Sequence, residues 1–330
     1  MAANNSLNAG ESSLKIINGQ VIFVQVLVFV FLCINSLLIM TFFMKDYFYS
    51  SMRYILFAMT LLSDCLYLLM TDILLILSYF RFTIQMWFCL VIYMTLSLYN
   101  YLTPVTLTAM TLERYVAICL PLRHSVLCST RSCMHCILFI HSISCLPCIA
   151  VLSIFFASAT HGFYIQKNVC SVEIFIFHKW QGHLRSAISQ FYFLVMVSII
   201  VVCYVQIIKV AKAASGENKK STWKGLRTVI LHGFQLLLCL IQLWCPFIEA
   251  ALLQTNFLLY INVRYFNYIT FTLAPRCLSP LIYGLRDEMF FHALKYYALF
   301  FIKIANRSTK TCNVGCMPYV CLNIRKNLIY

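Results

Sequence analysis

Seven long apolar segments constrain this chain more than any other feature of its sequence. A helix of about 20 apolar residues crosses the roughly 30 Å hydrocarbon core of a bilayer. Hydrophobic residues form 62% of the chain and charged residues 11%, whereas soluble domains contain roughly 45–50% and 25%. The sequence therefore predicts an all-α membrane protein, whose expected spans are Val21–Met44, Tyr54–Leu77, Phe88–Cys119, Cys133–Ser158, Ala187–Lys212, Leu226–Leu253 and Tyr265–Leu285.

The internal pattern of these segments favours helices over a β-barrel. A membrane barrel alternates apolar and polar residues over segments of roughly ten residues, whereas these runs are continuously apolar. Membrane helices also tolerate proline, because neighbouring helices or water satisfy the freed carbonyls. The sequence thus predicts a seven-transmembrane helix bundle, and five of the seven prolines fall inside its spans: Pro104, Pro147, Pro246, Pro275 and Pro280.

The distribution of basic residues predicts the orientation of this bundle. With the N-terminus outside, the outer segments hold six Lys and Arg residues and the inner segments hold eighteen. An excess of basic residues marks the cytoplasmic side. We therefore expect a multi-pass plasma-membrane protein with an extracellular N-terminus and a cytoplasmic C-terminus.

The same topology divides the chain into four parts. Residues 1–20 form an extracellular tail, 21–285 the bundle, 286–303 a short amphipathic juxtamembrane helix, and 304–330 a cytoplasmic tail. We expect no cleavable signal peptide, because the first apolar run is too long for the apolar region of one. Asn4 begins an N-glycosylation motif on the outer side. Cys312 and Cys316 are candidates for palmitoylation, the alternative being unmodified reduced thiols.

Cysteine positions agree with this orientation. Of 17 cysteines, only Cys89 and Cys170 fall on the oxidising side, so one bridge between them is the only extracellular disulfide that the sequence allows. Two Cys-x-x-Cys pairs, beginning at Cys133 and Cys145, have zinc-like spacing but lie within an apolar helix. We expect no metal and no cofactor.

Charged residues inside the predicted spans are the first candidates for function. A charge near the bilayer centre costs at least roughly 2.5–3.5 kcal/mol. Asp64 and Arg276 lie in the second and seventh spans, and their carboxylate and guanidinium can neutralise each other if the helices are neighbours. Asp72 and Glu249 lie nearer the outer ends, where snorkelling to the interface is the simpler interpretation.

One stretch of the chain resembles a known family. Met110-Thr111-Leu112-Glu113-Arg114-Tyr115-Val116-Ala117-Ile118-Cys119-Leu120-Pro121-Leu122-Arg123-His124 is similar to the signature that ends the third helix in odorant receptors, which are rhodopsin-like G-protein-coupled receptors. The resemblance covers about residues 21–303 and is of the fish type. Other matching positions stand on the expected spans: Asn35, Leu62-Ser63-Asp64, Tyr204, Ile207, Lys224, Thr228, His232, Trp244-Cys245-Pro246 and Pro280 to Asp287.

Several positions depart from the family pattern. Ser279 stands where the wider family usually has Asn before Pro-x-x-Tyr, and Glu113 replaces the commoner Asp. Trp244 keeps the general receptor pattern, which many odorant receptors lack. The long outer loop has one cysteine, whereas many mammalian odorant receptors have more.

The resemblance implies a small-molecule odorant that enters from outside, and a heterotrimeric G protein that docks inside. The implied ligand-binding residues are Ser97, Asn100, Tyr101, Tyr192, Trp244, Phe247, Ile248 and Thr272, although each has an alternative role in helix packing. The implied coupling and switch residues are Glu113, Arg114, Tyr115, Tyr204, Pro280 and Tyr283. Leu96 and Ser97 stand where amine receptors carry an acid, and the seventh span has no Lys for a retinal Schiff base.

Other functions fit the sequence less well. A transporter would show internal repeats and paired broken helices, and no repeat is evident. An intramembrane enzyme would need a nucleophile with a base or a carboxylate dyad, but Asp64 and Asp72 are about 12 Å apart along one helix. The basic residues lie between apolar runs, which argues for membrane lipids rather than nucleic acid as partners. A rhodopsin-like receptor for a non-odorant small ligand is the remaining alternative.

Overall fold

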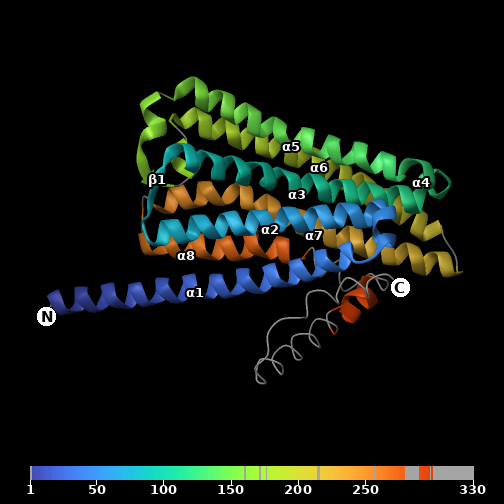
Figure 1. Cartoon of the computed structure of the whole chain (residues 1–330), viewed down its shortest axis with the longest axis horizontal. Coiled ribbons are helices and arrows are strands. Elements are labelled where there is room, and N and C mark those ends of the chain that lie inside the picture. Colours follow the sequence, from blue (N-terminus) through green and yellow to red (C-terminus); the bar gives the residue numbers. More distant parts are fainter. Residues whose placement is uncertain are drawn as a thin grey trace, which may run out of the picture.

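The computed structural model describes residues 2–159, 161–170, 172–175, 177–213, 216–253, 255, 257–278, 290–297 and 299. Its helices run alongside one another as a bundle, with the N-terminal part of α1 projecting beyond one end (Figure 1). The main elements are α1 (Ala2–Phe43), α2 (Met52–Tyr79), β1 (Thr83–Gln85), α3 (Met86–Cys119), α4 (Pro121–Leu127), α5 (Thr130–Ser158), β2 (Lys167–Val169), α6 (Lys179–Ala213), α7 (Gly216–Leu253), α8 (Phe257–Asn267) and the π-helical segment η4 (Tyr268–Leu273). Short 3-10 helices are η1 (Asp46–Ser50), η2 (His161–Ile165) and η3 (Val172–Phe175).

The helices agree with the predicted seven-span bundle. Five segments among the described residues are long and apolar enough to cross a membrane: Asn18–Phe43, Met52–Tyr79, Met86–Cys119, Arg131–Ser158 and Trp180–Val210. The predicted sixth span lies within α7 and ends with it at Leu253. The seventh corresponds to the end of α8, η4 and the helical residues 274–278, and its remainder lies outside the described residues.

The first helix begins earlier than the predicted span. We expected the helix from Val21, whereas α1 starts at Ala2. The sequence before Val21 contains no proline, and Gly10 and Gly19 are its only glycines, so no residue type there stops helix propagation. The segment that is apolar enough to span begins at Asn18.

Packing distinguishes two kinds of apolar surface. The largest buried cluster joins α1, α2, α3 and α5, with Leu56, Leu61 and Leu107 completely inaccessible. On the outside, large apolar side chains such as Phe29, Leu138 and Phe191 are each more than 60% exposed. Extensive exposed apolar surface is unfavourable in water and favourable in lipid, so the exterior is that of a membrane protein.

A two-stranded antiparallel sheet, absent from our sequence prediction, closes one end of the bundle. Thr83 of β1 pairs with Val169 of β2, and Val169 directly precedes Cys170, one of the two predicted disulfide partners. Cys89 and Cys170 form the predicted disulfide, which is confirmed with a Cα–Cα distance of 5.5 Å. The sheet and the disulfide together hold the loop after α5 against α3. We call the end of the bundle that carries this sheet and disulfide the disulfide end, and the opposite end the α4 end.

Part of the predicted amphipathic juxtamembrane helix lies within the described residues. Residues 290–297 are helical, and Phe290, Ala293 and Tyr297 are buried at a spacing of three and four. Phe290 packs against Phe48 of η1, with ring centroids 5.2 Å apart. This spacing buries one side of a helix, as an amphipathic helix requires.

Candidate functional site

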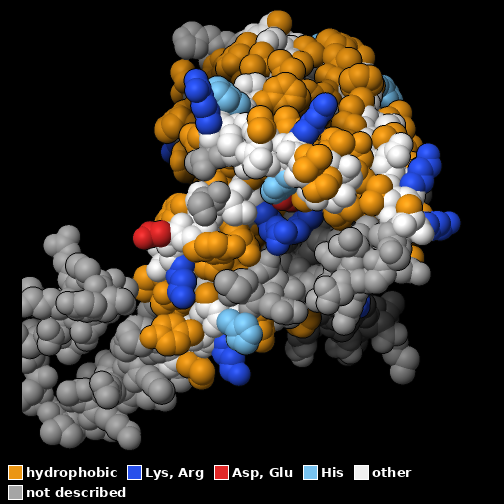
Figure 2. Space-filling model, turned by 90° about the vertical axis from the view of Figure 1, so that its right-hand side faces the viewer, with side chains coloured by type: hydrophobic (Ala, Val, Ile, Leu, Met, Phe, Trp, Pro, Cys, Tyr) orange, Lys and Arg blue, Asp and Glu red, His pale blue; other side chains and the backbone are white. Residues whose placement is uncertain are grey.

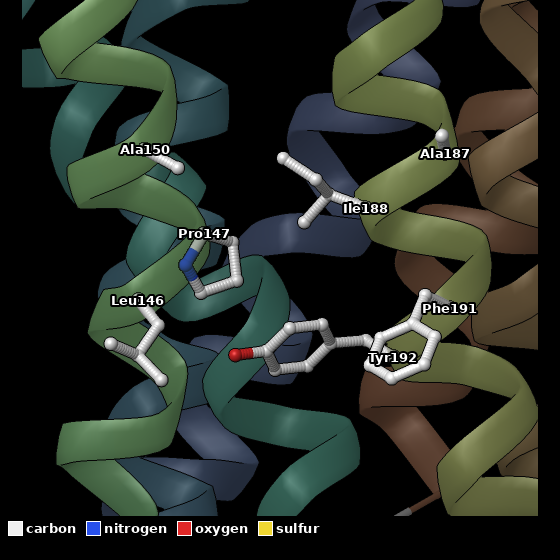
Figure 3. A pocket seen from close by; sticks show the side chains of 7 residues that line it. All are labelled: Leu146, Pro147, Ala150, Ala187, Ile188, Phe191 and Tyr192. Carbon is white, nitrogen blue, oxygen red and sulfur yellow. The ribbon is translucent and has the colours of Figure 1, made fainter.

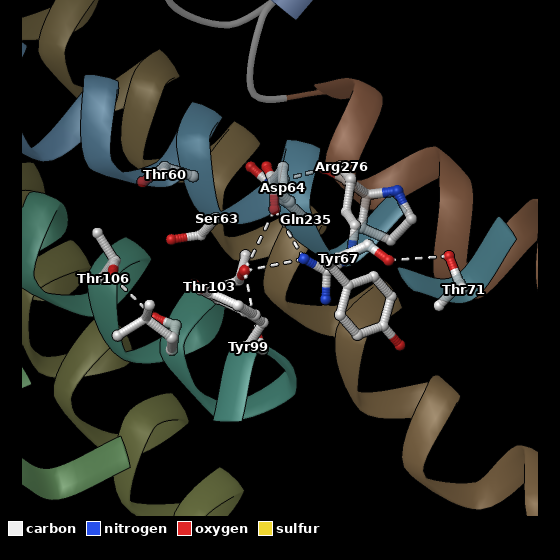
Figure 4. Close-up of polar contacts among 12 residues, drawn as sticks. Thr60, Ser63, Asp64, Tyr67, Thr71, Tyr99, Thr103, Thr106, Gln235 and Arg276 are labelled. Carbon is white, nitrogen blue, oxygen red and sulfur yellow. Dashed lines mark hydrogen bonds and ion pairs between the residues drawn. The ribbon is translucent and has the colours of Figure 1, made fainter. Parts of the chain in front are cut away.

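The predicted intramembrane ion pair joins α2 to the helical residues that follow η4. Arg276 Nη1 donates to Asp64 Oδ1 at 2.8 Å, and the two side chains are 3% and 0% exposed (Figure 4). The predicted contact is therefore confirmed. Both charges are removed from solvent, so their mutual attraction has to offset a large desolvation cost.

Two further side chains complete the surroundings of Arg276. Thr103 of α3 accepts a hydrogen bond from Arg276 at 3.0 Å and donates one to Asp64 at 3.2 Å. The Arg276 guanidinium carbon lies 3.4 Å from the centroid of the Tyr67 ring on α2. A desolvated guanidinium over an aromatic face gains about 2 kcal/mol or more. Sequence reasoning missed Thr103 and Tyr67, which are unremarkable residue types in an apolar helix.

The polar network continues from this ion pair to α7 and η4. Gln242 of α7 donates to the Tyr67 hydroxyl at 3.1 Å. Tyr268, the first residue of η4, donates to Thr71 of α2 at 3.2 Å. One layer of hydrogen bonds therefore connects α2, α3, α7 and η4. Such a layer makes the relative positions of these helices interdependent, because shifting one leaves buried polar groups without partners.

The predicted ligand residues of α3 and α6 lie together. Tyr101, 6% exposed, has its hydroxyl 2.7 Å from that of Ser189, and its ring centroid is 5.7 Å from that of Tyr192. Ser97 lies within hydrogen-bonding reach of the Cys148 thiol on α5. Asn100 is half-buried on the same helix. Thr272 is 9% exposed in η4. These residues are consistent with an interior site.

The predicted ligand residues of α7 do not join them. Trp244 and Ile248 are 54% and 48% exposed, and nothing is described for the Phe247 side chain. Gln242 faces Tyr67 of α2, and Trp244 follows two positions later, about 200° around the helix. The structure differs from our prediction because the polar residues of α7 determine which side of that helix faces the bundle. Our prediction instead placed the tryptophan by its position in the family pattern.

A described groove of about 390 Å³ lies between α5 and α6. Figure 3 shows Tyr192 extending from α6 across this groove toward α5, where its hydroxyl donates to the carbonyl of Ile143 at 3.0 Å. We expected the cleft among the third, fifth, sixth and seventh spans, so this groove is in a different place. Its lining residues are Leu146, Pro147, Ala150, Ala187, Ile188, Phe191 and Tyr192.

The carboxylates of Asp72 and Glu249 do more than extend toward the membrane interface. Asp72 accepts a hydrogen bond from Gln25 of α1 at 2.5 Å. Glu249 of α7 accepts one from Asn267 of α8 at 2.9 Å. Both carboxylates therefore link neighbouring helices.

The α4 end brings together the predicted coupling residues. Glu113 lies between two basic side chains, with Arg114 Nε and His124 Nε2 each 3.5 Å from one of its carboxylate oxygens. His124 lies on α4, whose first residue is Pro121, a favoured position for proline. Sequence reasoning did not assign His124 a role. Figure 2 shows this end of the molecule, where Lys and Arg side chains stand around hydrophobic ones.

Three helices meet beside this cluster. Tyr115 of α3 and Tyr204 of α6 pack against Ile207 and Leu226, the latter from α7. Pro280, Tyr283, Cys312 and Cys316 lie outside the described residues, and Asn4 lies near the start of α1. The structure thus brings together four of the six predicted coupling residues.

Comparison with known proteins agrees with this architecture. Residues 34–283 match the family model described as 7 transmembrane receptor (rhodopsin family). A relative, Odorant receptor 131-2 from Danio rerio, is 42% identical over 275 residues, which cover 83% of this chain and 84% of the relative. This chain belongs to the rhodopsin family of seven-transmembrane receptors and, within it, to the odorant receptors.

Proposed function

We propose that this protein binds small-molecule odorants from the extracellular side and activates a heterotrimeric G protein inside the cell. One observation carries the proposal: the α4 end collects Glu113, Arg114, Tyr115 and Tyr204 from two helices, at the opposite end of the bundle from the Cys89–Cys170 disulfide. Separate ends suit a protein that receives a ligand on one side of a membrane and a partner on the other.

The ligand site in this proposal is formed mainly by α3, α6 and η4. Ser97, Asn100, Tyr101, Tyr192 and Thr272 supply aromatic walls with hydroxyl and amide groups, the usual composition of a small-molecule site. A ligand acts by favouring one arrangement of these helices over another. The hydrogen-bond layer around Asp64 and Arg276 shares α3 and η4 with this site, so it is the element through which a shift would pass toward the α4 end.

The proposal includes the orientation and modification of the chain. The N-terminus is extracellular and glycosylated at Asn4, and the C-terminus is cytoplasmic and palmitoylated at Cys312 and Cys316. The protein acts in the plasma membrane as a receptor rather than as an enzyme. Sodium does not regulate it, because Arg276 already neutralises Asp64 at 2.8 Å.

Expression in cultured cells tests the proposal. Tags at both ends establish orientation: the N-terminal tag is stained on intact cells, and the C-terminal tag only after permeabilisation. A panel of water-soluble small molecules is then applied with a cyclic-nucleotide readout. Arg114→Ala is expected to keep surface staining and lose the response. Lys45→Ala, which removes an exposed cation before η1, is the matched control and keeps it. A normal response from Arg114→Ala refutes the coupling role.

A further inference from the structure

Arg185 lies on the side of α6 that faces the bundle. Further along that helix, Ser189, Met196 and Ile200 are each at most 8% exposed. They follow Arg185 by 4, 11 and 15 positions, which is the repeat of one helix face. Arg185 itself is half-buried. Its place on this face means that it is directed toward α3 rather than toward lipid headgroups.

The surroundings of Arg185 are aromatic and held in place by the disulfide end. Its Nη1 donates to the hydroxyl of Tyr93 on α3 at 3.5 Å. The Tyr93 ring stacks on Phe175 of η3, with centroids 4.9 Å apart. Phe175 packs in one cluster with Cys89 and Cys170, so the disulfide fixes the aromatic pair beside the guanidinium.

Among the side chains that the structure describes, Arg185 differs from the buried Arg276 in having no acidic partner. Arg276 has Asp64, whereas no carboxylate whose side chain the structure describes is within ion-pair distance of Arg185. Two acids with described side chains near the outer ends of their helices have other partners, Asp72 bonding to Gln25 and Glu249 to Asn267. A guanidinium carries five N–H donors in a planar fork that fits a carboxylate, and one long contact to Tyr93 uses a single donor.

One helical turn beyond Arg185 along α6, the neighbouring side chains are polar and aromatic rather than cationic. Arg185 is close enough to Tyr101 to act on its phenol electrostatically, and Tyr101 bonds to Ser189 at 2.7 Å. Ser189 lies four positions after Arg185 along the helix, an axial rise of about 6 Å. A molecule that contacts both therefore has an anionic group at one end and a short body.

We propose that Arg185 binds the carboxylate of a small anionic ligand, whose aliphatic or aromatic body extends toward Tyr101 and Ser189. This inference rests on the proposed receptor function and names its ligand class. The absence of an acid at Leu96 and Ser97 on α3 fits the same conclusion, since an acid there would repel such a ligand. Tyr93 is a positioning residue, because its hydroxyl orients the guanidinium.

Matched probes test the charge requirement. Monocarboxylates from acetate to decanoate, together with phenylacetate, are compared with their primary amides on cells expressing the receptor. Carboxylates are expected to activate it and their amides to be at least about 10-fold weaker. Arg185→Gln is expected to raise the half-maximal carboxylate concentration about 10- to 100-fold, as expected for losing a hydrogen bond to a charged group. Arg185→Lys retains part of the response.

Lys167→Gln is the matched control, since Lys167 is an exposed cation of β2 at the same end. Its effect is expected to stay below about 3-fold, because salt screens exposed charges. As a second measurement, the same probes are added to the purified receptor during thermal unfolding. Carboxylates are expected to raise the unfolding midpoint of the wild type and to leave that of Arg185→Gln unchanged.

Two results would overturn the inference. One is equal potency of carboxylates and amides, unchanged by Arg185→Gln, which leaves the receptor function intact. The other is that no carboxylate alters either signalling or thermal unfolding of the wild type. The proposed function fails separately, if carboxylates stabilise the purified protein through Arg185 while no probe of either series produces a cyclic-nucleotide response in cells.

Discussion

Breaking the Asp64–Arg276 pair should destabilise the bundle more than removing the pair entirely. Asp64→Asn leaves the Arg276 guanidinium buried without a counter-charge, whereas Asp64→Leu combined with Arg276→Met removes both charges. The first change uncovers the whole desolvation cost of one ion, and the second exchanges a costly pair for apolar contacts. The two variants therefore separate the strength of the contact from its net contribution to stability.

The distance between the two charges sets the size of the expected destabilisation. At 2.8 Å, and with an effective dielectric constant of about 20, the Coulomb attraction is about 6 kcal/mol. Desolvation offsets much of that gain, so removing one partner of a buried pair costs roughly 3–5 kcal/mol. With an unfolding entropy of about 2.1 cal/mol/K per residue, each kcal/mol shifts the unfolding midpoint of this 330-residue chain by about 1.4 °C. Asp64→Asn should therefore lower the midpoint by about 4–7 °C. The double variant should lie within about 3 °C of the wild type.

The assay is thermal unfolding of the purified receptor in detergent, at one fixed heating rate because membrane proteins often unfold irreversibly. Asp46→Asn is the matched control, since Asp46 is an exposed acid at the start of η1 and surface changes usually cost less than about 0.5 kcal/mol. Repeating the measurement with potassium in place of sodium should change none of the midpoints. The reasoning is refuted if Asp64→Asn unfolds with the wild type, or if the double variant is as unstable as the single one.

Three further predictions concern other parts of the bundle. Cys89→Ser should reduce surface expression severalfold on a flow cytometer, because the loop after α5 loses a constraint of about 2–4 kcal/mol; unchanged expression contradicts this. Gln242→Leu should lower the midpoint by more than Trp244→Ala, since Gln242 bonds to Tyr67 of α2 whereas the Trp244 side chain is 54% exposed, and the reverse order would mean that Trp244 faces inward. Burial, with the Glu113 carboxylate nearby, raises the pKa of the Cys128 thiol above its usual 9.0, so its maleimide labelling, followed by mass spectrometry, should stay slow at pH 7.4 and accelerate only above pH 9.

The predictions from the sequence succeeded where charge decided the outcome. Asp64 and Arg276 are among very few charges in the spans, and each has to be neutralised, so their pairing followed from composition and helix order. The disulfide followed in the same way, because the topology left two cysteines on one side. The helix ends were predicted within a few residues for α2, α3 and α5, since apolar runs define spans directly.

The sequence revealed less about which side of each helix faces inward. In water, apolar residues mark the buried face, but lipid is as apolar as a leucine side chain, so a helix that is hydrophobic all round carries no such mark. The α6 helix illustrates the problem: Phe191 is 65% exposed and Met196 8%, although both are large apolar residues. Assigning ligand residues from family positions alone therefore misplaced Trp244 and Ile248 relative to the interior of the bundle.

Polar residues carry the information that apolar ones lack. Gln235, Gln242 and Glu249 follow one another at intervals of seven along α7, so they share one face. On that face, Gln235 donates to the carbonyl of Pro275, Gln242 donates to Tyr67, and Glu249 accepts from Asn267. An amide or carboxylate that faced lipid would lose such partners at a cost of several kcal/mol. The same logic applies to Arg185, which shares a face of α6 with the buried Ser189. In a membrane bundle, the rotation of each helix is therefore read from its few polar side chains, and these are also the groups that recognise a ligand.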